Sequence, residues 1–194
     1  CRGLPIAHLI RSSTTMPTAS PPSCPTPFNL AAYVLFGSGA SDQRIALQLL
    51  DDRATRWSYG RLRQTVLGTA GGLASLGLPR GARVLLRLNN TADFPVAYLA
   101  AIAADLIPVP TSASLTVPEI TAIANDLDPS LILSAPGVAL PDPLSCPVLS
   151  LNDLRALADS PPLEPILGDP NRPAYIVYTS GTGGRARGVI HAHR

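Results

Sequence analysis

The chain has 194 residues, of which 46% are hydrophobic and 14% are charged. A disordered chain combines low hydrophobicity with high net charge, so this composition excludes disorder along the whole length and predicts a folded core. The formal net charge of +2 is too small for a general nucleic-acid-binding protein, and no run of about 20 apolar residues predicts a membrane span. We therefore expect neither a nucleic-acid partner nor a spanning helix.

The basic residues are unusual in kind and in position. All 15 are arginine, and the chain contains no lysine. Residues 171–194 hold four arginines and no acidic residue, which places the positive balance beside a glycine-rich run. This local charge favours a small anionic ligand.

Three cysteines, Cys1, Cys24 and Cys146, are widely spaced along the chain. No Cys-x-x-Cys or Cys/His cluster accompanies them, so the sequence indicates neither a disulfide framework nor a metal site built from protein side chains. Unpaired thiols of this kind are typical of a cytoplasmic protein, which is the location we expect.

Residues 1–27 are predicted to form a disordered leader. Residues 11–27 are rich in Ser, Thr and Pro and offer little to bury. The single methionine, Met16, lies within this leader and is the candidate translation start. The pattern of a folded domain begins near Phe28, so residues 28–194 are expected to form the structured part.

From residue 28 onward, helix and strand patterns alternate. Asn29 is the predicted cap of a helix that ends at Phe36, and residues 45–50 and 55–59 predict a β-hairpin. Further helices are expected at 58–76, 92–104, 116–127 and 153–158, and strands at 84–88, 107–110, 131–133, 148–149 and 174–178. The alternation predicts an α/β fold with a mainly parallel sheet and packed helices.

The last 21 residues, AYIVYTSGTGGRARGVIHAHR, combine a buried-type strand with glycines, hydroxyls and arginines. We expect the strand to deliver the following run to the carboxyl edge of the sheet, and the run to open a helix. Glycines allow tight turns that direct N–H groups inward, and phosphate oxygens need such an array of donors and cations. The residues predicted to bind a triphosphate or pyrophosphate are Thr179, Ser180, Gly181, Thr182, Gly183, Gly184, Arg185 and Arg187. An ordinary Gly/Ser/Thr surface loop is the structural alternative.

Two other phosphate motifs can be compared with this run. A Walker loop needs a lysine after its last glycine, and Val189 stands there instead. A dinucleotide fingerprint is matched by Gly181, Gly183 and Ala186, which leaves an oxidoreductase as an alternative. That fingerprint also needs an acidic residue about 20 positions later, which the chain does not reach.

Residues 178–189 resemble the signature phosphate loop of the adenylate-forming superfamily, usually Y-T-S-G-T-T-G-x-P-K-G-V. The superfamily includes acyl-CoA synthetases, related luciferases and the adenylation domains of peptide synthetases. Further similarities follow in the family's order: RWSYGRL at 56–62, LGLPRGARV at 76–84, TADFPVAY at 91–98 and PVPTSASLT at 108–116. The last two are most similar to the acyl-CoA and benzoate-CoA ligase branch. The resemblance covers residues 28–194, which we expect to be a partial N-terminal domain that stops after the phosphate loop.

The resemblance implies a two-step ligase. ATP and a small carboxylic acid give an acyl-adenylate and pyrophosphate, and the thiol of CoA then forms the thioester; Mg²⁺ is implied as well. By position, residues 179–184 would surround the β- and γ-phosphates, and His193 would support the loop. No catalytic residue is expected within the chain, because the family's acyl pocket, adenine site and late lysine lie downstream. The chain alone is therefore expected to be inactive, and a non-catalytic remnant is another alternative.

Four positions depart from the family pattern. Gly183 replaces Thr or Ser, Ala186 replaces Pro and Arg187 replaces Lys. These changes remove a hydroxyl, free the backbone and alter the geometry of the cation. Asp105 stands where the pattern favours glycine, and Asp fits a left-handed turn there at some cost. The histidines at 191 and 193 lack a third ligand or a base partner, so we expect structural roles for them.

Overall fold

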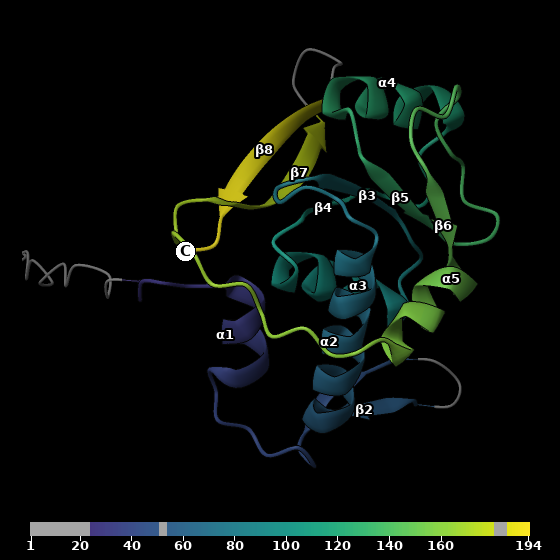
Figure 1. Ribbon diagram of the computed structural model, residues 1–194. Coiled ribbons are helices and arrows are strands. Elements are labelled where there is room, and N and C mark those ends of the chain that lie inside the picture. The colour runs from purple at the N-terminus through teal and green to yellow at the C-terminus, as the bar shows by residue number, and fades with distance from the viewer. Residues whose placement is uncertain (1–23, 51–53, 181–185) are drawn as a thin grey trace, which may run out of the picture.

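The computed structural model describes residues 24–50, 54–180 and 186–194. Its centre is a parallel four-stranded sheet in the order β4-β3-β5-β6. The strands are β3 (Arg83–Arg87), β4 (Ile107–Pro110), β5 (Leu131–Ser134) and β6 (Val148–Ser150). One face carries α1 (Leu30–Phe36), α2 (Tyr59–Ser75), α3 (Asp93–Ala103) and α5 (Leu151–Ala156), and the other carries α4 (Val117–Leu127), as Figure 1 shows. The α/β prediction is confirmed.

The sheet separates two hydrophobic cores because successive side chains of a strand point to opposite faces. Val84 and Leu86 of β3 are fully buried on the face that carries α1, α2 and α3. Leu85 is fully buried on the opposite face, where it packs with Ile120 and Ile123 of α4. Two-sided burial explains why the strands read as continuous apolar runs rather than as alternating ones.

The first helix begins where its cap predicts. The Asn29 side-chain oxygen accepts the N–H groups of Ala31 and Ala32, and Gly37 follows the last helical residue. The Asn29 amide also donates to the carbonyl oxygens of Ile102 and Ile166, both at 2.9 Å. One polar side chain therefore caps α1 and joins it to two distant segments.

A hairpin of β1 (Ile45–Gln48) and β2 (Arg56–Ser58) precedes α2, as predicted, and its residues 51–53 lie outside the described part. Ser58 caps α2 by accepting the N–H of Arg61 at 3.2 Å. Midway along α2, Gly68 lies so close to the Ala158 carbonyl that an added Cβ would overlap it. Glycine therefore lets α2 pack tightly against the 3-10 turn η1 (Leu157–Asp159) that ends α5.

The end of the chain differs from the prediction. Residues after the glycine-rich run form a strand, β8 (Ala186–Ala192), rather than a helix. This strand pairs antiparallel with β7 (Pro173–Ser180), and the pair is a separate two-stranded sheet in the described part of the chain. The pattern V-I-H-A has the β-branched residues of a strand, which is the signal that the expectation of a helix overlooked.

The structure describes only residues 24–27 of the expected leader. Residues 1–23, with Cys1 and Met16, lie outside the described part, and residues 24–27 form no helix or strand. Phe28 makes the first backbone pairing, an antiparallel bridge to Gly168. Among the residues that the structure describes, no helix has the length and apolarity required to cross a membrane.

Candidate functional site: the tip of the β7–β8 hairpin

The hairpin places the two ends of the predicted phosphate loop beside each other. Thr179 is the partner of Arg187 in the strand register, and Ser180 is the partner of Ala186. Thr179 and Arg187 are both exposed, so a hydroxyl and a guanidinium from neighbouring strands are available to one ligand. The five other predicted phosphate-binding residues lie outside the described part of the chain: Gly181, Thr182, Gly183, Gly184 and Arg185.

Tyr178 attaches the hairpin to α4. Its hydroxyl donates to the Asp126 carboxylate at 2.7 Å. Burial and this hydrogen bond raise the pKa of Tyr178, so the phenol stays protonated at neutral pH. Across the hairpin, a Cβ on Gly188 would lie 3.2 Å from the Tyr178 ring, and glycine leaves room for the ring there. Tyr178 thereby holds the β7–β8 hairpin against α4.

A cavity of about 890 Å³ opens beside the hairpin tip. Its walls come from β7 and β8, from α4 and from the segment that follows β4. Residues from the hairpin that line it are Tyr178, Thr179 and Ala186, and residues after β4 include Thr111 and Ser112. Although β7 lies outside the parallel sheet, its tip thus reaches the carboxyl end of β4, where ligands bind in α/β folds.

A buried arginine holds one wall of this cavity in place, and the sequence reasoning missed it. Arg87 ends β3 and is fully buried. Its guanidinium donates to the Thr111 hydroxyl, to the carbonyl oxygens of Ser112 and Leu115, and to that of Ala139. Burial lowers the pKa of Arg87, and no described carboxylate pairs with it. The available signal was an arginine inside the apolar strand RVLLRL.

His193 lies at the base of the hairpin, at the opposite end from Ser180. Its ring is almost fully buried, and Nδ1 accepts the N–H of Leu30 at 3.0 Å. Burial, helped by the nearby charge of Arg172, lowers the pKa of His193 to about 4. A neutral imidazole therefore joins the end of β8 to the start of α1. This contact gives His193 a structural role, as the sequence predicted; its support of the loop stays a prediction.

His191 lies two residues earlier, on β8, and takes part in an aromatic stack. Its ring is 4.5 Å from the ring of Tyr175 in a parallel arrangement, and Tyr175 in turn contacts Tyr98 of α3. The stack holds the hairpin against α3. No group of three or more His, Cys, Asp or Glu side chains with the spacing of a metal site occurs in residues 24–50, 54–180 and 186–194.

The chain was compared with known protein families. Residues 38–194 match the family described as AMP-binding enzyme. The chain belongs to that family. Because its relatives include acyl-CoA and benzoate-CoA ligases, the adenylate-forming resemblance is confirmed.

Relatives of this AMP-binding chain include CoA ligases from bacteria and from a plant. It is 31% identical over 153 residues to 4-hydroxybenzoate–CoA/benzoate–CoA ligase of Rhodopseudomonas palustris, covering 70% of this chain and 28% of the relative. It is 32% identical over 175 residues to 4-coumarate–CoA ligase-like 3 of Oryza sativa, covering 75% and 29%. The chain thus spans under a third of the length of these relatives.

Solved structures of this fold include a benzoate CoA ligase from Burkholderia xenovorans, with a TM-score of 0.70 and 22% identity over 86% of this chain and 35% of the other. ATP-bound MatB from Rhodopseudomonas palustris has a TM-score of 0.71 and 24% identity, covering 85% and 35%. At this identity the likeness shows the fold alone. That fold is the N-terminal α/β architecture of adenylate-forming enzymes.

Proposed function

We propose that the chain supplies the triphosphate-binding part of an ATP-dependent acyl-CoA synthetase, which converts a carboxylic acid through an acyl-adenylate into an acyl-CoA. The observation that supports this most directly is the pairing of Thr179, which lines a large cavity, with the exposed Arg187 on the neighbouring strand. Family membership supports the same chemistry. The helix that a dinucleotide fingerprint would need after the loop is a strand here, so no observation favours the oxidoreductase alternative.

In this proposal the hairpin tip binds and orients the β- and γ-phosphates. The Thr179 hydroxyl acts as a donor, and Arg187 supplies a permanent positive charge. The residues Ser180, Gly181, Thr182, Gly183, Gly184 and Arg185 would complete the array. Holding the triphosphate in line with the attacking carboxylate and balancing the charge of the leaving pyrophosphate are the contributions that such groups make to phosphoryl chemistry.

Mg²⁺ and CoA belong to the proposal as well. Magnesium is commonly held by substrate phosphates, water and one or two carboxylates, so it does not need a cluster of protein ligands. Two exposed acids line the cavity: Asp126 is engaged by Tyr178 and Glu119 by Thr116, which leaves the phosphates as the main ligands. Bound there, Mg²⁺ would neutralise phosphate charge.

The acyl substrate is proposed to be a small carboxylic acid. Benzoate and 4-hydroxybenzoate occur in the name of one relative, and a long-chain fatty acid occurs in that of another. The sequence similarity to the benzoate-CoA ligase branch favours the smaller acids. A cytoplasmic location and the inactivity of the chain by itself stay predictions.

Equilibrium titration with nucleotides tests the phosphate site. We expect the chain to bind ATP, to lose it to added pyrophosphate and to show no preference for NAD. Arg187→Gln should weaken ATP binding about tenfold, because a charge-assisted contact to phosphate is lost. Binding of pyrophosphate should weaken by a similar factor, because the hairpin tip is proposed to hold the phosphates rather than the adenosine. The exposed Arg80 provides a matched control in Arg80→Gln, which should leave both affinities unchanged.

Carboxylate-dependent exchange of labelled pyrophosphate into ATP measures the activity itself, with benzoate and hexanoate as the first acids, and it requires a longer protein that joins this chain to the downstream part of the family's sequence, because the chain alone is expected to be inactive. Equal affinity of Arg187→Gln and the parent chain for ATP would contradict the phosphate role of the hairpin tip. Tighter binding of NAD than of ATP would contradict the ligase assignment altogether.

A further inference from the structure

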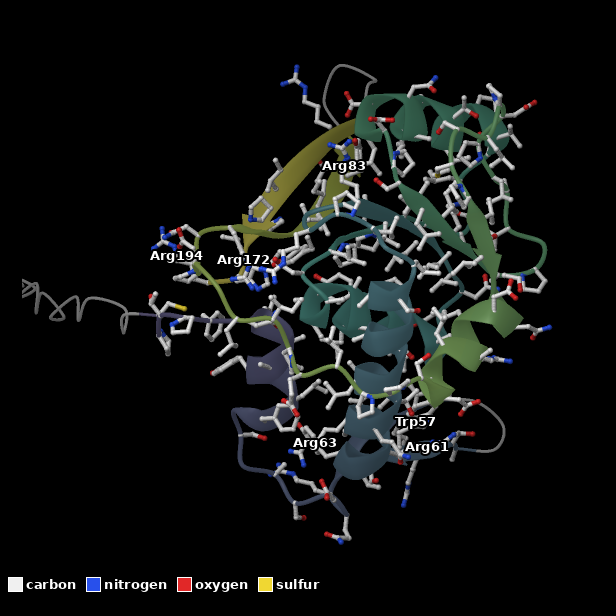
Figure 2. All side chains as sticks on the ribbon, viewed as in Figure 1. Trp57, Arg61, Arg63, Arg83, Arg172 and Arg194 are labelled. Carbon is white, nitrogen blue, oxygen red and sulfur yellow. The ribbon has the colours of Figure 1, made fainter. Side chains whose placement is uncertain are left out.

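A second cavity, of about 420 Å³, lies on the face of the molecule that carries α2 and α3. Its walls come from β2, the first half of α2, the start of α3 and α5. Figure 2 places two of its residues, Trp57 and Arg61, at the end of α2 that is farthest from the β7–β8 hairpin. The cavity is therefore separate from the predicted phosphate site.

Some polar groups around this cavity already have hydrogen-bond partners within the chain. The Asp93 carboxylate accepts Arg155 Nε at 2.8 Å and Nη2 at 2.9 Å, and the Thr91 hydroxyl at 2.9 Å. The hydrogen bond from Arg155 is the main reason that the pKa of Asp93 is lowered. The one carboxylate that lines the cavity is thus fully used as an acceptor.

Two arginines beside the cavity have N–H groups that can still donate a hydrogen bond. The Arg61 guanidinium lies over the Trp57 ring, 3.9 Å from its centre, and makes no ion pair with the described residues. Stacking uses the face of the guanidinium and leaves its in-plane N–H groups available. Arg155 has one terminal nitrogen beyond those that bind Asp93.

Thr69 gives a second and independent sign of a ligand. It lines the cavity, is fully buried, and its hydroxyl has no hydrogen-bond partner among the described residues. A buried hydroxyl without a partner is costly, so such groups are rare unless a water or ligand satisfies them. The apolar walls between Thr69 and the arginines come from Leu49, Val96 and Leu154.

We propose that this cavity is a second ligand site that takes a small carboxylate with an apolar body. The carboxylate pairs with Arg61 and with the spare nitrogen of Arg155, the hydrocarbon part lies against the apolar walls, and Thr69 donates to an acceptor on the ligand. An acceptor-rich anion is chosen because the guanidinium groups of Arg61 and Arg155 can only donate and the Thr69 hydroxyl can donate as well. The proposal does not depend on the function of the hairpin.

The single tryptophan of the chain makes the site directly observable. The indole N–H resonance of Trp57 is followed by nuclear magnetic resonance while cyclohexanecarboxylate is added, with the neutral cyclohexanecarboxamide as the matched ligand. We expect a saturable shift with the carboxylate and none with the amide. Absence of a saturable shift, or an equal response to the amide, would overturn the proposal.

Two variants separate the roles of the charge and the hydroxyl. Arg61→Gln should weaken carboxylate binding about tenfold, because a charged hydrogen bond is lost, whereas Arg80→Gln should leave it unchanged. Thr69→Val should weaken binding about threefold and stabilise the ligand-free chain towards urea, because it removes an unpaired buried hydroxyl. Unchanged binding in Arg61→Gln, or an equal loss in Arg80→Gln, would show that Trp57 reports no specific site.

Discussion

Arg172 Nε donates to Asp105 Oδ1 at 2.7 Å, although the two residues are 67 positions apart. Both side chains are largely buried. Asp105 forms the left-handed turn between α3 and β4, with φ of 60°, and Arg172 immediately precedes β7. The guanidinium also donates to the carbonyl oxygens of Phe28, Ile166 and Asp169. This pair therefore fixes the base of the β7–β8 hairpin to the parallel sheet.

We expect Asp105→Asn to lower the free energy of unfolding by about 2 kcal/mol, because a charged and largely buried hydrogen bond is replaced by a neutral one. Asparagine tolerates the left-handed backbone, so the loss measures the pair rather than the turn. Urea denaturation gives the value. Asp105→Gly is the matched variant: it relieves the turn but also removes the acceptor. A stability gain in Asp105→Gly would mean that the turn outweighs the ion pair.

The buried Arg87 leads to a second prediction. Arg87→Met should lower the free energy of unfolding by about 3 kcal/mol, because it leaves several buried carbonyl oxygens without donors. Hydrogen exchange of residues 111–115 should rise at the same time, since these residues form the cavity wall that Arg87 holds. Arg87→Lys should be nearly as unstable as Arg87→Met, because a single ammonium cannot reach groups spread over two segments. Full stability of Arg87→Lys would contradict the need for a guanidinium.

Stability should depend on pH through His193. Its pKa is lowered to about 4 in the folded chain, against about 6.5 in the unfolded chain. Between these values only the unfolded state binds the proton, so stability falls as the pH drops from about 6.5 to about 4, by up to about 1.4 kcal/mol per pH unit. Below that range both states are protonated and the contribution is constant.

Urea denaturation at several pH values measures this dependence. His193→Gln should be less stable at neutral pH, because the Leu30 N–H loses its imidazole acceptor, and should show a flatter profile between pH 6.5 and 4. His191→Gln serves as the control, since the more accessible His191 ring lies in the aromatic stack. An unchanged profile in His193→Gln would assign the pH dependence to other groups.

Packing of α2 against η1 supports a further prediction. In an open helix, Gly→Ala is favourable by about 1 kcal/mol. At Gly68 the new methyl group would overlap the Ala158 carbonyl, so Gly68→Ala should instead destabilise the chain by about 2 kcal/mol. Thermal or urea denaturation measures the change. Gln64→Ala, on the exposed face of the same helix, should stay within about 0.5 kcal/mol of the parent chain.

Local signals in the sequence were sufficient for most of the fold. Asn29 and Ser58 cap their helices through the hydrogen bonds that their side chains predict. The capping residues Thr116 and Glu119 likewise begin α4, with the Glu119 carboxylate accepting the Thr116 N–H at 2.8 Å. Asp105 has the positive φ expected of a residue that replaces glycine. Each of these features depends on residues within a few positions, which is why a single sequence reveals them.

Long-range features were harder to predict. The identity of β8 depends on its pairing with β7, and the glycines between them favour a turn before either a helix or a strand. The role of Arg87 depends on carbonyl oxygens up to 52 positions away. Tertiary contacts of this kind leave only a faint signal, such as one charged residue in an apolar strand.

The hydrogen bond between Leu30 and His193 has a consequence for synthesis. It joins residues 163 positions apart, and Asn29 reaches Ile166 across 137 positions. A chain made from its N-terminus exposes α1 long before these partners leave the ribosome. Closing so long a loop lowers the conformational entropy of the chain, and local contacts do not compensate for that loss. Asn29 meets Ile102 of α3 across only 73 positions, so we expect α1 to pack on α3 first and its hydrogen bonds to Ile166 and His193 to form later, after the parallel sheet.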